Sequence, residues 1–216
     1  MEKAPRSPRS RPVTTEREMA AVASPARQEI VDVLMQMGKA SVTEIARTLG
    51  RPPDSLYYHV RALERAGLVV QAGSRGRGRR REAVYRTDAP ELTLRYDPSS
   101  AANVRGTVRI IDSMLRLTGR DFRRGYRAGH AVVEGPRREI WAIRATGWLT
   151  PAMIQDVNRR MRDLKNVVAK RGNRAGRLYA ITMVLVPLDR GRAKRKKVAS
   201  RTRVRERPRV RRPVKL

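Results

Sequence analysis

Hydrophobic residues recur three or four positions apart in three successive segments near the start of the chain, and a glycine follows each segment. This spacing places apolar side chains on one face of a helix. The first segment begins at Ser24-Pro25, because a side-chain oxygen can cap a helix and proline fits its first turn, and it ends at Gly38. A shorter segment covers about 43–49 and ends at Gly50. The pattern predicts two helices joined by a turn.

A third helix is predicted over residues 54–66. Pro52-Pro53 stops the second helix, Asp54 or Ser55 is expected to cap the third, and Gly67 ends it in a left-handed conformation. Its narrow apolar stripe consists of Leu56, Val60 and Leu63. The opposite face carries polar side chains with long reach, which are Asp54, Tyr58, Arg61 and Arg65, with Ser55 and Tyr57 beside them. A helix that enters the major groove of DNA needs such a face, although a solvated face would look the same.

A β-hairpin with a basic tip is predicted directly after this helix. Residues 68–70 favour a strand, and residues 83–86 favour the returning strand. The loop over 74–81 carries five arginines, which are Arg75, Arg77, Arg79, Arg80 and Arg81. Their charges repel one another unless an anion lies beneath them, and a phosphate backbone or a narrow minor groove provides one. Three helices followed by such a hairpin are typical of a winged helix-turn-helix.

Residues 97–100, Asp-Pro-Ser-Ser, separate this first region, 19–96, from a second region, 101–188. The second region begins with a predicted helix over 101–118. One apolar stripe of this helix consists of Val104, Val108, Ile111 and Leu115. A second stripe, rotated around the helix axis from the first, consists of Ile110, Met114 and Leu117. A helix that is apolar on two sides is covered on two sides. We expect one stripe to pack against the chain's own core. The other stripe packs against the same helix of a second subunit or, alternatively, the helix lies at the centre of a monomeric domain.

The rest of the second region predicts strands over 138–149 and 178–188, with a helix from Thr150 between them. We therefore expect an α+β chain, in which a winged helix-turn-helix precedes a small α+β domain for dimerisation or for an effector. Residues 1–18 and 190–216 are rich in arginine and proline and are expected to be disordered basic tails.

The charge balance indicates a polyanionic partner. Lys and Arg number 50 against 20 Asp and Glu, so the formal net charge is +30. Such a charge favours nucleic acid or an anionic surface through counterion release. No apolar run reaches the length of a membrane span, so a membrane is not expected as the partner. The expected compartment is the cytoplasm, in association with the nucleoid.

Neither catalysis nor a cofactor is expected. The chain has no cysteine and only two histidines, His59 and His130, which are too few for a zinc site without several carboxylates. The second region shows no pairing of a nucleophile with a base and no phosphate-cradling glycine loop. Trp141 and Trp148 could line a ligand pocket, but aromatic side chains more often form the core. No effector can be named from the sequence.

The first region resembles the ArsR-type winged helix-turn-helix transcriptional regulators. The stretches that carry the resemblance are Ser-Pro-Ala-Arg-Gln-Glu-Ile-Val (24–31), Thr-Glu-Ile-Ala (43–46) and Ser-Leu-Tyr-Tyr-His-Val-Arg-Ala-Leu-Glu-Arg-Ala-Gly-Leu-Val (55–69). The resemblance implies a dimeric regulator whose third helix enters the major groove. The recognition positions that it implies are Ser55, Tyr57, Tyr58, His59 and Arg61. The chain lacks the thiolate ligands of the metal-sensing members, so metal sensing is not expected.

Three functions remain open. The first is a sequence-specific regulator that binds double-stranded DNA as a homodimer, with contacts from the third helix, Arg65 included, and from the basic hairpin. The second is an architectural or nucleoid protein that coats DNA without sequence preference, which would suit the +30 charge. The third is an RNA-binding protein, although the single phenylalanine argues against platforms for stacking single-stranded bases.

Overall fold

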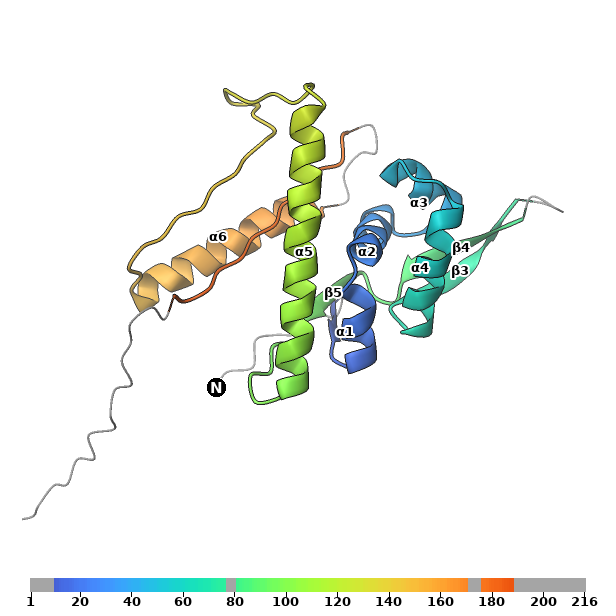
Figure 1. The fold of residues 1–216 in the computed structure, drawn as a ribbon, viewed down its shortest axis with the longest axis horizontal. Helices are drawn as coiled ribbons and strands as arrows, with labels where there is room; N and C mark the ends of the chain where they lie inside the picture. Colours follow the sequence, from blue (N-terminus) through green and yellow to red (C-terminus); the bar gives the residue numbers. More distant parts are fainter. Residues whose placement is uncertain (1–9, 77–80, 171–175, 189–216) are drawn as a thin grey trace, which may run out of the picture. The chain divides into compact units, whose positions relative to one another are not determined.

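The computed structural model describes residues 10–76, 81–170 and 176–188 (Figure 1). In chain order its elements are β1 (Ser10–Val13), α1 (Glu16–Val22), α2 (Pro25–Met37), β2 (Ala40–Ser41), α3 (Val42–Leu49), α4 (Asp54–Arg65), β3 (Val69–Arg75), β4 (Glu82–Thr87), β5 (Glu91–Leu94), α5 (Ala101–Arg127) and α6 (Pro151–Ala169). The chain divides after Met183, and residues 184–188 form neither helix nor strand. The three predicted helices are confirmed as α2, α3 and α4, and the α+β class is confirmed with them.

The boundaries of α3 and α4 follow from local chemistry. A capping box opens α3: the Glu44 N–H donates to Ser41 Oγ at 3.2 Å, and the Ser41 N–H donates to a Glu44 carboxylate oxygen at 2.8 Å. Gly50 ends α3 with φ of 62°, and Gly67 follows α4 with φ of 71°. Both angles lie in the left-handed region that glycine adopts without a steric penalty, so these glycines stop the helices as expected.

The expected side-chain cap of α4 by Asp54 or Ser55 is wrong. Pro53 is the capping residue, and it already has helical backbone angles, with φ of −57° and ψ of −39°. The Ser55 hydroxyl instead donates back to the Pro52 carbonyl oxygen at 2.7 Å. The fixed φ of proline starts the helix here, so no side-chain acceptor is required.

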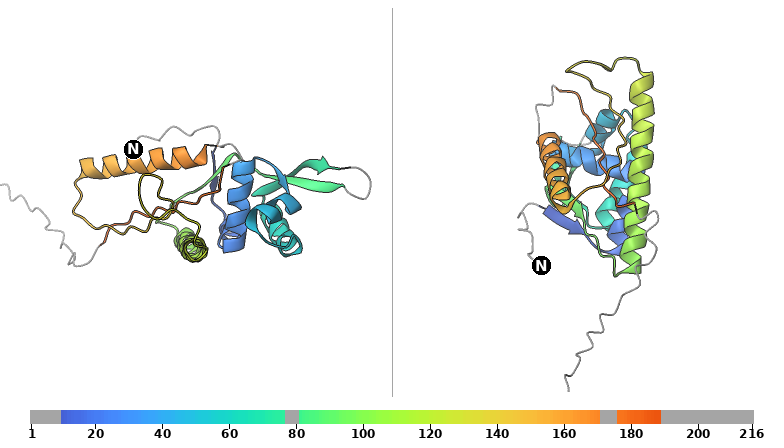
Figure 2. Two further views of the ribbon diagram at one scale, coloured as in Figure 1. Left: turned by 90° about the horizontal axis from the view of Figure 1, so that it is seen from above. Right: turned by 90° about the vertical axis from the view of Figure 1, so that its left-hand side faces the viewer.

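A core built from α1 to α4 supports a projecting hairpin. The largest fully buried side chains of this region are Met19, Ile30, Leu34, Ile45, Leu56, Leu63 and Leu68. Burial of each such side chain contributes about 1.5–3 kcal/mol. β3 and β4 pair antiparallel from Val69 opposite Thr87 to Arg75 opposite Glu82, and β2 pairs with the other edge of β4. Figure 2 shows this hairpin extending past the helices.

Part of the segment expected to be a disordered arm has regular structure. β1 pairs in parallel with β5, from Ser10 opposite Glu91 to Val13 opposite Leu94, and Val13 is buried. Arg11 pairs with the Glu18 carboxylate at the start of α1. The backbone pairing and this ion pair order a stretch whose own composition favours disorder. Residues 1–9 and 189–216 lie outside the described residues.

α5 begins where the Asp-Pro-Ser-Ser segment ends and continues past the expected end at 118. One predicted stripe packs on the chain's own core: Ile110 and Leu117 are buried, and Gln28 of α2 donates to the Ile110 carbonyl oxygen at 3.2 Å. The other stripe is exposed in the single chain, with Val108 52% and Leu115 48% exposed. The helix is therefore covered on one of its two apolar sides.

One carboxylate of α2 links α5 to the turn before α4. A Glu29 carboxylate oxygen accepts from Arg51 Nη2 at 2.6 Å, and the other oxygen pairs with Arg120 of α5. Arg51 lies in the turn between α3 and α4. The Glu29 side chain is largely buried, and this burial raises its pKa, although the Arg51 and Arg120 guanidinium groups offset part of the effect.

The strands predicted over 138–149 and 178–188 are wrong. Both stretches are free of strand and helix, and large apolar side chains along them, such as Trp148, are exposed. Alternating residues favour a strand only where a second backbone offers hydrogen bonds, and no other described segment of the chain pairs with either stretch. The helix between them is confirmed as α6, which Thr150 caps by accepting from the Met153 N–H at 3.3 Å.

Candidate nucleic-acid interface

The face of α4 that points away from the core is polar and open to solvent. The core-facing side chains of this helix, Leu56, Val60 and Leu63, are at most 1% exposed. On the opposite side Tyr58 is 66% exposed, and Tyr57 on the flank is 41% exposed. The other sequence-predicted positions with exposed side chains on α4 are Ser55, Arg61 and Arg65. The buried stripe fixes the rotation of the helix, so it also fixes the direction in which these polar side chains project.

His59 differs from its neighbours because its ring is half-buried. Its Nδ1 atom is buried and has no hydrogen-bond partner among the residues that the structure describes. Burial lowers the pKa of His59, and the nearby charges of Arg27 and Arg51 lower it further. The ring is therefore neutral at pH 7, and it lies edge-on against Tyr58 with centroids 5.6 Å apart. In this position the His59 ring can hold the Tyr58 ring in place.

The described part of the hairpin brings two of the five predicted arginines near α3 and β3. The Arg75 guanidinium pairs with the Glu44 carboxylate of α3 at 2.7 Å. The Arg81 side chain donates from Nε to Ser74 Oγ at 2.7 Å. Arg77, Arg79 and Arg80 lie outside the described residues. The Glu44 carboxylate therefore neutralises part of the Arg75 charge, while the Arg75 side chain stays about half exposed.

The hairpin borders α4 on one flank. Tyr85 of β4 is half-buried, and burial together with the nearby Glu64 carboxylate raises its pKa, while the Arg61 guanidinium acts in the opposite direction. The phenol therefore remains protonated at neutral pH. Glu64 and Arg61 of α4 thus lie on the flank of this helix that is near Tyr85 of the hairpin.

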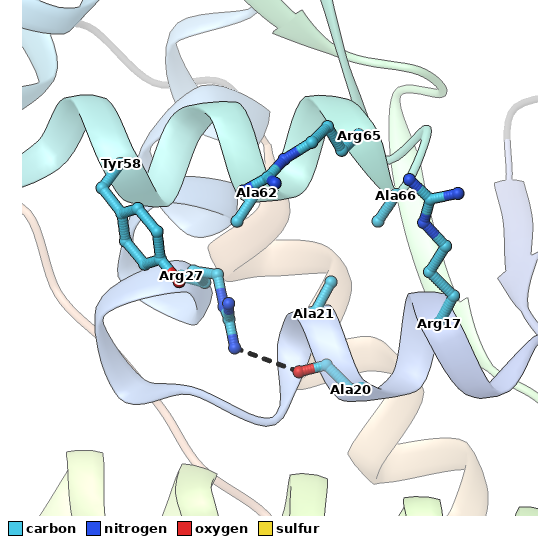
Figure 3. Close-up of a pocket in the computed structure, with 8 residues that line it drawn as sticks. All are labelled: Arg17, Ala20, Ala21, Arg27, Tyr58, Ala62, Arg65 and Ala66. Atoms are coloured by element: carbon cyan, nitrogen blue, oxygen red, sulfur yellow. Dashed lines mark hydrogen bonds between the residues drawn. The ribbon is translucent and has the colours of Figure 1, made fainter.

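The other flank of α4 borders an open pocket of about 330 Å³ (Figure 3). Four alanines from α1, from α4 and from the position directly after α4 line it, together with Arg17 of α1, Arg27 at the start of α2, and Tyr58 and Arg65 of α4. Arg27 Nη2 donates to the Ala20 carbonyl oxygen at 3.1 Å, which holds this side chain across the gap between α1 and α2. The pocket therefore combines small side chains with three guanidinium groups.

The sequence interpretation included Tyr58 and Arg65 among the binding residues but missed Arg17 and Arg27. Nothing in their local sequence distinguishes these two arginines from solvated residues.

 Arg17 falls in the segment that was expected to be disordered, and Arg27 sits on a helix whose apolar stripe drew attention to its other side. Only the packing of α1 and α2 beside α4 brings them together with Arg65.

Within residues 10–76, 81–170 and 176–188, no three His, Asp or Glu side chains are grouped so that they could hold a metal ion. Over the same ranges, no helix combines the length and the apolar character that crossing a membrane requires.

Comparison with known proteins assigns the first region to a domain type. No curated protein matches the chain. The model of one domain family does match, and it covers α2, α3, α4 and the beginning of β3. Residues 22–72 are thus identified as a helix-turn-helix domain, the kind of domain through which DNA-binding regulators contact DNA.

Proposed function

We propose that this protein is a sequence-specific transcriptional regulator that binds double-stranded DNA as a homodimer. In this proposal α4 enters the major groove, and the hairpin of β3 and β4 contacts the backbone or the minor groove. The observation that carries it is the exposed face of α4, where Tyr58 and Arg61 project from a helix that its buried stripe holds in place. Among helix-turn-helix regulators, the sequence of residues 55–69 favours the ArsR type.

The side chains of α4 match the chemistry of base edges. Arg61 can donate two hydrogen bonds to guanine O6 and N7, and Tyr57 or Tyr58 can contact a thymine methyl group or a phosphate. Asp54, which is exposed at the start of α4, can accept from cytosine N4 but would repel a phosphate. Side chains of these types form different contacts with different base pairs, which supports sequence-specific binding over uniform coating.

The exposed stripe of α5 supports the homodimer. Val104, Val108 and Leu115 lie on one side of α5, and Phe122 continues the same spacing toward the end of the helix. These side chains are four, seven and seven residues apart, a spacing that keeps them on one side of a helix as in a heptad seam. A second copy of α5 would remove them from water and would pair two α4 helices for two half-sites on DNA.

Selection of bound duplexes from a random pool tests the function. The full chain is expected to enrich a motif whose two halves are related by two-fold symmetry, with half-site centres about one helical turn apart. Uniform recovery of all sequences would support the architectural alternative, which the +30 charge favours. Stronger binding of single-stranded RNA than of duplex DNA at equal salt would support the RNA-binding alternative.

Sedimentation of two matched variants tests the homodimer. Leu115→Ser removes an exposed apolar side chain from the stripe, and Arg116→Ser makes the same new side chain at the next exposed position. We expect the first variant to shift toward monomer while the second sediments like the unmodified chain. Equal sedimentation of both variants and the unmodified chain would contradict a dimer contact at Leu115.

A further inference from the structure

The pocket beside α4 gathers positive charge that the rest of the described structure leaves without a counterion. Arg17, Arg27 and Arg65 line it, and none of them forms an ion pair with a carboxylate in the described part of the chain. The Nε atom of Arg27 is buried and lacks a hydrogen-bond partner there. A guanidinium group with unused donors is suited to the oxygens of a phosphate, which it can bind through two parallel hydrogen bonds.

The lining of the pocket allows a phosphate group to come close. Its alanines, such as Ala21 and Ala62, leave room between α1 and α4 (Figure 3). The contact of Arg27 with the Ala20 carbonyl oxygen holds one guanidinium group in position before any ligand arrives. A donor that is already in place loses less conformational entropy when it binds.

The position of the pocket relative to α4 identifies the source of the phosphate. The hairpin borders the flank of α4 that carries Arg61, and the pocket borders the opposite flank at Ala62. A major groove is about 12 Å wide and an α-helix is about 10–12 Å across, so a helix in the groove has a phosphate backbone on each flank. Tyr58 and Arg65 belong to both the exposed face of α4 and the pocket, so the two surfaces are continuous.

We infer that this pocket binds a phosphate of the DNA backbone, on the strand that borders α4 on the side away from the hairpin. The inference rests on the proposed function, because it requires α4 to lie in the groove. Arg17, Arg27 and Arg65 bind the phosphate oxygens, and the backbone contacts on both flanks fix the depth and register of α4. Phosphate contacts of this kind position α4 in the groove and carry no sequence preference themselves.

Ethylation interference on the selected duplex tests the site one phosphate at a time. With the full chain, ethylation of one phosphate in each half-site, on the strand away from the hairpin, should block binding. In Arg17→Gln/Arg27→Gln this interference should disappear while the interference at all other phosphates remains. The slope of log K against log salt should become shallower by about one for each phosphate contact that is lost.

A matched control and a second variant keep the result interpretable. Arg137→Gln/Arg162→Gln removes the same charge at two exposed positions outside the pocket and should leave every interference position unchanged. Arg17→Gln alone, at an exposed side chain, should weaken the same interference without affecting the fold, which a thermal melt checks. An unchanged interference pattern in the pocket variants, with binding retained, would overturn the site and leave the proposed function standing.

Two other outcomes separate the sources of phosphate and the two proposals. Titration of the free protein with inorganic phosphate at constant ionic strength should show no saturable binding below the millimolar range. Tight binding of free phosphate that Arg17→Gln/Arg27→Gln abolishes would instead make the pocket an effector site and overturn the backbone contact. Failure of the unmodified chain to bind any duplex would overturn the proposed function and this inference together.

Discussion

Gly106 of α5 lies against Met19 of α1 so closely that a Cβ atom added at Gly106 would be 2.7 Å from Met19 Sδ and 3.2 Å from Met19 Cβ. Met19 is only 1% exposed, so its side chain has little room to move. The absence of a side chain at Gly106 therefore allows α5 to pack directly on α1. This contact joins the long helix to the helix-turn-helix region.

Replacement of Gly106 by alanine is expected to destabilise the protein. In a helix interior, alanine is about 1 kcal/mol more stabilising than glycine. Overpacking against Met19 costs about 1–3 kcal/mol, so the free energy of unfolding should fall. Gly125→Ala is the matched control, because a Cβ there would meet no atom within 4 Å and should stabilise α5. Urea unfolding measures both. Equal stability of the two variants would show that Met19 accommodates the added methyl group.

Loss of the Glu44 charge is expected to strengthen DNA binding. Glu44→Gln removes the ion pair that holds Arg75 but leaves an oxygen that can accept from the Ser41 N–H in the capping box. We expect affinity to rise about two- to fivefold, in line with the strength of an exposed ion pair of ~0.4–1 kcal/mol. Fluorescence anisotropy with a labelled duplex measures the change. Glu134→Gln, at an exposed acidic position on a different segment, should have no such effect.

Arg61 and Arg75 are expected to affect binding in different ways. Arg61→Ala should reduce the preference for the selected motif over random duplex by about 1–3 kcal/mol, because a base contact is lost. Arg75→Ala should weaken binding to both duplexes by the same factor, because a phosphate contact carries no sequence information. Competition binding with both duplexes measures the ratio. A ratio that Arg61→Ala leaves unchanged would contradict a base contact at this residue.

Glu18 gives stability a defined dependence on pH. Burial would raise its pKa, but the N–H groups of Thr15 and Thr14 and the Arg11 guanidinium outweigh burial and lower the pKa below the ordinary value of 4.5. A lowered pKa in the folded state stabilises the protein above pH 4.5, and this contribution is lost as the pH falls through the folded pKa. Glu18→Gln should therefore be less stable than the unmodified chain at pH 6, and the difference should shrink by pH 3. A difference that does not depend on pH would contradict this assignment.

The basic segment 190–216 is expected to add affinity without adding specificity. Its many Lys and Arg residues can neutralise phosphates along the duplex, so their removal should flatten the salt dependence of binding. Selection with the shortened chain should still enrich the same motif. A changed motif would show that this segment reads bases.

The sequence was most informative where structure depends on neighbours in the chain. Gly50 and Gly67 stop helices through their own backbone freedom, and the stripe from Leu56 to Leu63 sets the rotation of α4. Pairing of β1 with β5 joins segments that are far apart in the chain, so no local pattern indicated it. The same reason explains the pocket, since Arg17 and Arg27 meet Arg65 only after α1 and α2 pack beside α4.

The two wrong strand predictions have a related physical cause. Alternation over 138–149 describes side chains that could cover a sheet, but it does not specify a backbone that would complete the sheet. Trp148 is entirely exposed in the single chain. Such a pattern indicates that a segment can form a strand, but the strand forms only where a second segment is present to pair with it.

The Glu29 side chain connects α5 to the turn that precedes α4. The same carboxylate contacts Arg120 on α5 and Arg51 in the turn that leads into α4. Removal of either arginine would leave the largely buried Glu29 carboxylate with one guanidinium partner fewer. The packing of α5 and the conformation of the turn before α4 therefore depend on the same side chain.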